Sequence, residues 1–578
     1  MDEISPSPIA GDCRGENFFR VDDGLRRLLP LYLDAATLTH FTPHFDRLGA
    51  LAGDRLDELA AVADKNPPVL HPRDRWGRDE DWIDYHPAYR EMEKIAFGDF
   101  QFHAMSHRGG VLGWAEPLPP VAKYTFTYLF VQAEFGLMCP ISVTDTSIHL
   151  IRKYAEPKLK EYLLSRMLSA DLGGLWKGTQ FMTEKAGGSD VGAIETVARQ
   201  EGGCWRLHGE KWFCSHADAD VALMLARPEG ASAGTGGLAL FALPRRLYDG
   251  RRNAYRIVRL KDKLGTRSMA SGEIRLDGAM AYPVGRLDQG FKQMLDQVNL
   301  SRLSHGVRAA AMMRRCLNEA LAASCGRQAF GRPVIEHPLM RRQLMKIMVP
   351  AEQALSLMLF TADALGRAQA GSSEAESLLR ILTPLIKFRA CRDNIQVATG
   401  AMEARGGNGY IEEWVNARLV RDAQIGVLWE GTSNMIALDL VMRAIGKVGA
   451  HRGLAQRLTE RLSAAALPAG FRQSLGESLD RAIALAEDVA RHPEAEPEAR
   501  QAATALYNAT SAVLLAWEGT RDPADARRAL VSRFVLEHRL APRDPLARPK
   551  GDWQERATDL LLAGKPVEVR AAAELLGP

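Results

Sequence analysis

The stretch Met182-Thr183-Glu184-Lys185-Ala186-Gly187-Gly188-Ser189-Asp190-Val191, here called the glycine loop, separates two kinds of sequence pattern. Before it, residues 24–180 show apolar periodicity that predicts helices broken by loops. After it, strand-sized apolar runs separated by Gly, Glu and Asp predict a small antiparallel β domain over 181–290. From residue 290 the helical periodicity returns. We therefore expect a mainly α protein with a central antiparallel β domain.

The length of 578 residues exceeds what one hydrophobic core usually supports, so we expect several domains. Three long helices are predicted over Gln293–Cys325, Pro338–Ala370 and Ser373–Ala404. Pro384 should bend the third helix or begin a new one, and the prolines of Asn66–Pro72 predict a loop. The predicted domains are a helical domain over 1–180, the β domain over 181–290, a helical bundle over 291–450 and further helices over 451–578.

Composition indicates an ordinary globular protein, with 46% hydrophobic and 25% charged residues and a net charge of +3. The acidic start lacks the apolar run of a signal peptide. The most apolar stretch, Tyr124–Val143, is interrupted by Gln132, Glu134 and Pro140, so we expect no membrane span. Seven scattered Cys residues without a Cys-x-x-Cys pair favour reduced thiols over disulfides or a zinc site. We therefore expect a cytoplasmic protein without a metal site.

Two segments beside the β domain could bind a flat, polar ligand. The glycine loop offers a Thr hydroxyl, free backbone N–H groups and close backbone approach, although a plain domain-joining turn is equally compatible with it. The segment Glu210-Lys211-Trp212-Phe213-Cys214-Ser215, here called the aromatic strand, places aromatic rings beside a hydroxyl. Taken alone, it is better explained as an edge strand with one buried face.

A third segment, Trp429-Glu430-Gly431-Thr432-Ser433-Asn434, is here called the base turn. It carries a single carboxylate between Trp and Gly, and burial beside an aromatic ring raises a carboxyl pKa toward the range of a general base. The alternative is a capping turn, since Thr and Ser are good N-caps. Gly406–Gly409 could simply cap a helix, and Arg327 in Arg327–Gly331 could bind a pyrophosphate or lie on the surface.

The order and spacing of these segments resemble the acyl-CoA dehydrogenase family over about residues 100–445. The motifs are Thr-Glu-x-x-x-Gly-Ser-Asp (183–190), Lys-Trp-Phe-x-Ser (211–215), Arg-x-x-Phe-Gly (327–331), Gly-Gly-Asn-Gly (406–409) and Glu-Gly-Thr (430–432). Departures from the family pattern resemble its AidB-like subgroup of adaptive-response flavoproteins. These similarities lie at Lys185–Ser189, Phe213–Ser215, Asn66–Leu70, His86–Tyr89 and Leu137–Ile141. The resemblance implies an acyl-CoA dehydrogenase-like fold (α, β, α bundle) with a C-terminal helical extension.

The resemblance also assigns roles to individual residues. It implies FAD as cofactor, an acyl-CoA substrate, an electron-transferring flavoprotein as acceptor and a homo-oligomer, with a tetramer as the expected form. The implied FAD contacts, some to a neighbouring subunit's cofactor, are Met182, Thr183, Gly188, Ser189, Phe213, Ser215, Arg327, Phe330, Gly407, Thr432 and Asn434.

Glu430 matches the glutamate that abstracts the α-proton of the thioester, while the β-hydride goes to the flavin. Some members carry the base on an earlier helix, but the matching position here is Ser301. Arg302 matches a buried Arg that supports the active site. The base can act only if donors at the thioester carbonyl lower the pKa of the α-carbon.

The resemblance also supports a second hypothesis, in which the protein is an AidB-like flavoprotein that binds duplex DNA through a basic C-terminal domain. Residues 451–578, however, hold 18 Arg and Lys against 18 Asp and Glu, whereas a DNA footprint should be basic. A separate segment, Arg245–Arg267, has nine Arg and Lys against two Asp; a solvated face of the β domain is favoured over phosphate binding. A third hypothesis is a flavoprotein that has lost dehydrogenase activity. The presence of Glu430 argues against it.

Overall fold

The computed structural model describes residues 9–547 and 551–577. The chain forms two compact units, one comprising Asp54–Ser304 and the other Met1–Gly53 together with His305–Pro578. We call the first the sheet unit and the second the helical unit. The division into four domains expected from the sequence is not tested by these two units and stays a prediction.

The long helices of the helical unit agree with the sequence pattern. They are α8 (Gly290–Gly326), whose residues from His305 onward belong to this unit, α9 (Pro338–Gln369) and α10 (Ser373–Arg405). Pro384 lies inside α10, which continues through it, so it does not begin a new helix. Proline removes one backbone hydrogen bond, and the buried residues around Pro384 show that packing maintains the helix there.

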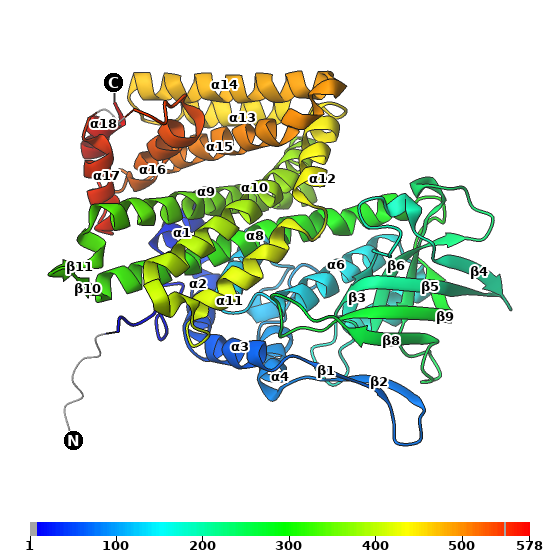
Figure 1. The fold of residues 1–578 in the computed structure, drawn as a ribbon. Coiled ribbons are helices and arrows are strands. Elements are labelled where there is room, and N and C mark those ends of the chain that lie inside the picture. The colour runs from blue at the N-terminus through cyan, green and yellow to red at the C-terminus, as the bar shows by residue number, and fades with distance from the viewer. Residues whose placement is uncertain (1–8, 548–550, 578) are drawn as a thin grey trace, which may run out of the picture. The chain divides into compact units, whose positions relative to one another are not determined.

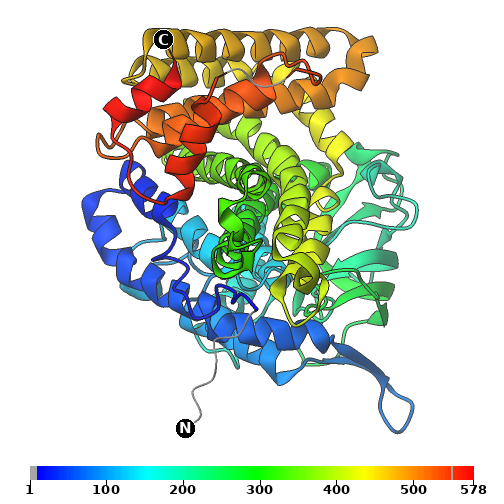
Figure 2. The ribbon, with the colours of Figure 1, turned by 60° about the vertical axis from the view of Figure 1, so that its left-hand side comes forward.

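Helices α1 and α2 begin the described part of the helical unit, and α11 to α18 complete it. Asp22 caps α1 (Asp23–Leu28) by accepting a hydrogen bond from the backbone N–H of Leu25. In both views α13, α14 and α15 lie side by side (Figures 1 and 2). The other bounds are α2 (Ala35–Gly53), α11 (Val415–Ala423), α12 (Ser433–Leu438), α13 (His451–Ser463), α14 (Ala469–Arg491), α15 (Ala499–Glu518), α16 (Arg527–Val535), α17 (Trp553–Leu562) and α18 (Val569–Leu576).

The predicted loop at Asn66–Pro72 is wrong in its second half. Val69–Arg73 is strand β1, paired antiparallel with β2 (Asp79–Asp84). Proline excludes helix but is tolerated in a strand that has a free edge, and the Asp74 side chain fixes the turn by accepting from two backbone N–H groups. The helices of the sheet unit are α3 (Arg55–Lys65), α4 (Pro87–Glu93), α5 (Pro120–Val131), α6 (Met138–Tyr154) and α7 (Pro157–Met167).

The central β domain is a seven-stranded sheet with the order β3-β6-β4-β5-β9-β7, and β8 pairs with β9. A further pairing of β6 with β7 closes five of the strands into a ring. Most pairs are antiparallel as predicted, but β6 runs parallel to both β3 and β4. The strands are β3 (Gly178–Phe181), β4 (Val197–Glu201), β5 (Cys204–Ser215), β6 (Val221–Pro228), β7 (Ala239–Pro244), β8 (Tyr255–Leu260) and β9 (Ser271–Pro283); the two-residue strands β10 (Gln328–Ala329) and β11 (Arg332–Pro333) form a separate hairpin.

Helix α9 is, within the described residues, the one helix long and apolar enough to cross a membrane. Its apolar window is 94% buried inside the protein. Core helices of globular units share these properties, so α9 indicates a membrane span only weakly.

Candidate active site

The base turn has an unusual backbone conformation at the candidate base. Glu430 has φ of +56° and Gly431 has φ of +107°. Glycine adopts positive φ freely, whereas a glutamate does so at a cost of about 1–3 kcal/mol and stays there only where its surroundings compensate for the strain. Such strained residues concentrate at active sites. The half-buried Glu430 therefore occupies a conformation that the rest of the helical unit must maintain.

Side chains distant in sequence hold this turn. The ammonium of Lys387, on α10, donates a hydrogen bond of 2.5 Å to the backbone carbonyl of Gly431, and the Lys387 side chain is 1% exposed. The Trp429 ring lies 5.2 Å from the ring of buried His305. Burial, together with the charges of Arg308 and Lys387, holds the pKa of His305 well below its usual range, so the imidazole is neutral.

Sequence reasoning missed both Lys387 and His305. Lys387 lies 44 residues before Gly431, and neither residue belongs to a motif that could be seen along the chain. The one available signal was a lysine among apolar residues in the middle of a predicted helix, which burial would make unusual without a partner.

The hydroxyl and amide groups after the base are open to a ligand. Thr432 occupies the N-cap position of α12, but its side chain does not cap the helix. Within the described part of the chain its exposed hydroxyl has no hydrogen-bond partner. Asn434 is also exposed. The capping explanation of this segment therefore does not account for the Thr432 side chain.

The other predicted contacts of the helical unit lie at two turns. Phe330 is 97% exposed at the tip of the β10–β11 hairpin, where Phe330 and Gly331 both have positive φ. Gly406 caps α10, and a Cβ placed there would lie 2.8 Å from the Arg327 guanidinium, so the structure brings these two segments together. A Cβ at exposed Gly407 would meet nothing within 4 Å.

In the sheet unit, the glycine loop and the aromatic strand lie side by side. The backbone N–H of Trp212 donates to the Thr183 carbonyl at 2.9 Å. The Thr183 and Ser215 side chains are half-buried, and across the described residues neither hydroxyl has a partner. Phe213 is 60% exposed beside them in the strand. Hydroxyls, an open ring and backbone are thus presented together, as a flat polar ligand requires.

A buried ion pair that sequence reasoning missed connects the same two segments. The Lys211 ammonium lies 2.6 Å from the Glu184 carboxylate, and their side chains are 0% and 4% exposed. Burial lowers the pKa of Lys211, and Glu184 opposes this shift. Glu184 also accepts hydrogen bonds from the backbone of Glu195 and Thr196. The one sequence signal for this ion pair was the presence of a Glu and a Lys in two neighbouring motifs.

The remaining predicted residues have simpler surroundings. Gly188 and Ser189 are exposed, and a Cβ at Gly188 would meet only the Thr183 methyl at 3.8 Å. Met182 is half-buried in the same loop. Arg302 was expected to be buried, but it is half-buried, with a hydrogen bond of 3.4 Å to the Asn299 amide oxygen. Ser301 lies beside it and is buried.

Taken separately, the residues of each unit fit part of a flavin nucleotide. The sheet unit presents two hydroxyls and an exposed ring, while the helical unit presents Arg327, the open position at Gly407 and the Thr432 hydroxyl. In the ranges that the structure describes, no cluster of three His, Cys, Asp or Glu side chains could hold a metal ion.

Comparison with known families and proteins agrees with this geometry. Residues 288–446 match the acyl-CoA dehydrogenase C-terminal domain, 179–279 its middle domain and 10–172 the N-terminal domain of the adaptive response protein AidB. The chain is similar to AidB of Escherichia coli (strain K12), with 35% identity over 68% of this chain and 71% of that protein. It is also similar to acyl-CoA dehydrogenase family member 11 of Caenorhabditis elegans, with 32% identity over 74% and 70%.

Among solved structures, Caenorhabditis elegans ACDH-11 in complex with C11-CoA has 27% identity, a TM-score of 0.85 and 94% coverage of each chain. The fold predicted from the sequence is confirmed, including the β domain between helical regions and the helical region at the C-terminus. With the family domains matched along residues 10–446 and two relatives above 30% identity, the chain belongs to the acyl-CoA dehydrogenase family, with an AidB-type N-terminal domain.

Proposed function

We propose that this protein is an FAD-dependent dehydrogenase of acyl-CoA thioesters, with Glu430 as the base that removes the α-proton. The observation that carries the proposal is the base turn, in which Glu430 has a positive φ and the buried Lys387 donates to the backbone carbonyl of the next residue, Gly431. A capping turn does not need a strained carboxylate or a buried ammonium. A general base does need a fixed position relative to the carbon it deprotonates.

The protein's own groups prepare the proton transfer. Glu430 is half-buried next to Trp429, so its carboxylate is partly shielded from water. Gly431 follows it and leaves room for the thioester to approach. When bound, FAD supplies the acceptor for the β-hydride. Thr183, Ser215 and Phe213 would hold its ring, and Thr432 and Asn434 would contact it in the helical unit.

The proposed substrate class rests on relatives and on the site together. ACDH-11 was solved with C11-CoA, and the E. coli relative is named as an acyl-CoA dehydrogenase. The proposal is limited to a CoA thioester with hydrogens on the α- and β-carbons, since the reaction removes one hydrogen from each.

Assembly, electron acceptor and location are further parts of the proposal. The 97% exposed Phe330 and the exposed Arg327 lie where the family reaches a neighbouring subunit's cofactor, which supports a homo-oligomer, with a tetramer as the expected form. An electron-transferring flavoprotein is the proposed acceptor. The seven cysteines are all unbridged, which supports a reducing cytoplasm.

DNA binding is the disfavoured second function. Of the nine Arg and Lys in Arg245–Arg267, five are ion-paired with carboxylates of the sheet unit: Arg251 with Asp249, Arg252 with Asp81, Arg256 with Asp79, and Arg259 and Lys261 with Glu273. These pairs offset part of the positive charge of the segment and support a solvated face. The extension over 451–578 has no net charge. The ion pairing of the segment and the zero net charge of the extension both disfavour non-specific DNA binding, which depends on an excess of cations.

The test is reconstitution followed by reduction. The purified protein, supplied with FAD, should show an oxidised-flavin spectrum, and anaerobic addition of straight-chain acyl-CoA esters of several lengths should bleach it. A folded protein that takes up no FAD, or a loaded protein that no acyl-CoA reduces, contradicts the proposal. Tight binding of duplex DNA at physiological salt that weakens steeply with added salt would instead support DNA binding as the function.

A further inference from the structure

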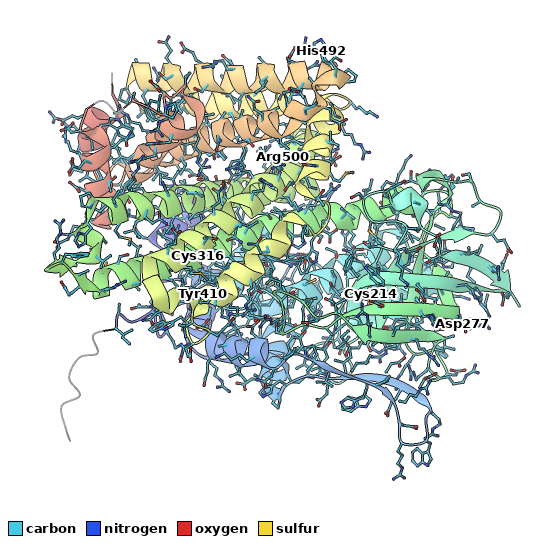
Figure 3. All side chains as sticks on the ribbon, in the orientation of Figure 1. Cys214, Asp277, Cys316, Tyr410, His492 and Arg500 are labelled. Atoms are coloured by element: carbon cyan, nitrogen blue, oxygen red, sulfur yellow. The ribbon has the colours of Figure 1, made fainter. Side chains whose placement is uncertain are left out.

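Two arginines converge on the base turn from helices that are far apart in sequence. Arg392, on α10, donates to the Ser433 hydroxyl at 3.1 Å. Arg500, at the start of α15, donates to the Asn434 amide oxygen at 3.4 Å. Helices α10, α12 and α15 pack against one another, and Figure 3 labels Arg500 at this place. The C-terminal extension therefore reaches the residues that follow the base.

Both arginines lack the acidic partner that their neighbours have. Arg389, one turn earlier on α10, pairs with Asp393 at 2.6 Å, and Arg380 pairs with Asp439 at 2.8 Å. Within the described residues, Arg392 and Arg500 form no ion pair, and each makes a single side-chain hydrogen bond. A guanidinium has five N–H donors, so most of their donor capacity is unused by the protein.

The two charges also act on each other. Burial lowers the pKa of Arg392, and the nearby charges of Arg500 and Arg389 lower it further, while Asp393 opposes the shift. Exposed Thr432 adds an unpartnered hydroxyl on the same turn. An anion bound between the two arginines would reduce their mutual repulsion and accept hydrogen bonds from their unused donors.

We propose that Arg392 and Arg500, together with the Thr432 hydroxyl, bind a phosphate of a nucleotide ligand, with the diphosphate of FAD favoured. Guanidinium groups bind phosphate oxygens through paired N–H donors, which matches two arginines with free donors. The position favours FAD because Thr432 and Asn434 follow the base directly and are the proposed FAD contacts of this unit. The inference rests on the proposed function. It makes the C-terminal extension a contributor to cofactor retention through Arg500.

Coenzyme A carries phosphates too, so the experiment measures both ligands. Apo-protein is titrated with FAD, followed by flavin fluorescence, and with CoA, followed by calorimetry, for the wild type, Arg392→Met and Arg500→Met. Arg481→Met is the matched control, because Arg481 is an exposed arginine on α14 with no described ion pair or side-chain hydrogen bond. Riboflavin, which has no phosphate, is titrated in parallel. Circular dichroism verifies that each variant is folded.

Each arginine variant should raise the Kd for FAD about tenfold or more, the loss typical of one charge-assisted contact. The Kd for riboflavin should stay unchanged, as should the Kd for FAD in Arg481→Met. A loss confined to CoA would keep the phosphate site but assign it to the substrate. Wild-type affinities for both FAD and CoA in folded Arg392→Met and Arg500→Met would overturn the inference. Failure of the wild type to bind FAD would instead contradict the proposed function.

Discussion

The glycine loop with its aromatic strand, in the sheet unit, and the base turn, in the helical unit, are held in place by different means. The first is fixed by neighbours in the sheet, through the Trp212 backbone bond to Thr183 and the pair Glu184–Lys211, whose members lie 27 residues apart. The base turn is fixed by Lys387 and contacted by Arg500, which lie 44 and 66 residues from their partners. The proposed cofactor contacts of the sheet unit are thus held by nearer neighbours in the sequence, whereas the base turn is contacted by more distant side chains.

The largest expected effect comes from the base itself. Glu430→Gln removes the proton acceptor but keeps the size of the side chain, so turnover of an acyl-CoA with an artificial electron acceptor should fall by a factor of about 10² to 10⁴. FAD content and thermal stability should stay near wild type, because Glu430 is not among the predicted FAD contacts. A variant that retains most of its turnover would place the base elsewhere.

Breaking the buried pair of the sheet unit should mainly cost stability. Lys211→Met leaves the Glu184 carboxylate buried without its cation, which typically destabilises a protein by about 3–5 kcal/mol. Urea unfolding measures the change. The control is Lys185→Met, since the pair Lys185–Glu210 is exposed and should contribute at most about 1 kcal/mol. Equal losses in the two variants would show that the buried pair does not hold these segments.

In both regions, the sequence predicted the candidate site residues better than the distant residues that contact them. The family resemblance, carried by the order and spacing of local motifs, assigned candidate roles to Thr183, Ser215 and Glu430. The three long helices were also predictable from their periodicity. Lys387, His305 and Arg500 were not, because their roles depend on which helices pack together. Strand pairing also depends on which distant elements come together, and for this reason the parallel pairs of β6 were missed.

Lys387 tests whether remote support matters for the base. Lys387→Met removes the donor to the Gly431 carbonyl, and losing a charged hydrogen bond typically costs about 1.5–3 kcal/mol. If part of this energy holds Glu430 in position, kcat should fall about tenfold while the Kd for FAD changes less. The exposed Lys447 provides the control variant Lys447→Met. An unchanged kcat in a folded Lys387→Met would show that the base turn maintains its own conformation.

The smallest effect is a pH dependence in the sheet unit. Burial lowers the pKa of His216 to about 4 from its ordinary value of 6.5. The unfolded chain takes up this proton first, so stability is retained above pH 6.5 and is lost as the pH falls toward 4. Between about pH 7.5 and 5.5 this histidine should account for about 1.4 kcal/mol of the loss.

His216→Asn isolates that contribution. Asparagine tolerates the positive φ of this position, +55°, and does not titrate. Chemical unfolding at the two pH values gives the loss of stability for each protein, and the variant should lose less on acidification than the wild type. Equal losses would mean that His216 is not held neutral by burial.

The reaction at Glu430 can be measured directly in a single turnover. FAD-loaded protein is mixed anaerobically with a straight-chain acyl-CoA that carries deuterium on the α-carbon, and the visible flavin absorbance and the release of deuterium to water are followed. We predict that the wild type bleaches and releases the label, whereas Glu430→Gln, with the same FAD content, does neither on the same timescale. Bleaching and label release at the wild-type rate in Glu430→Gln would contradict the assignment of the base.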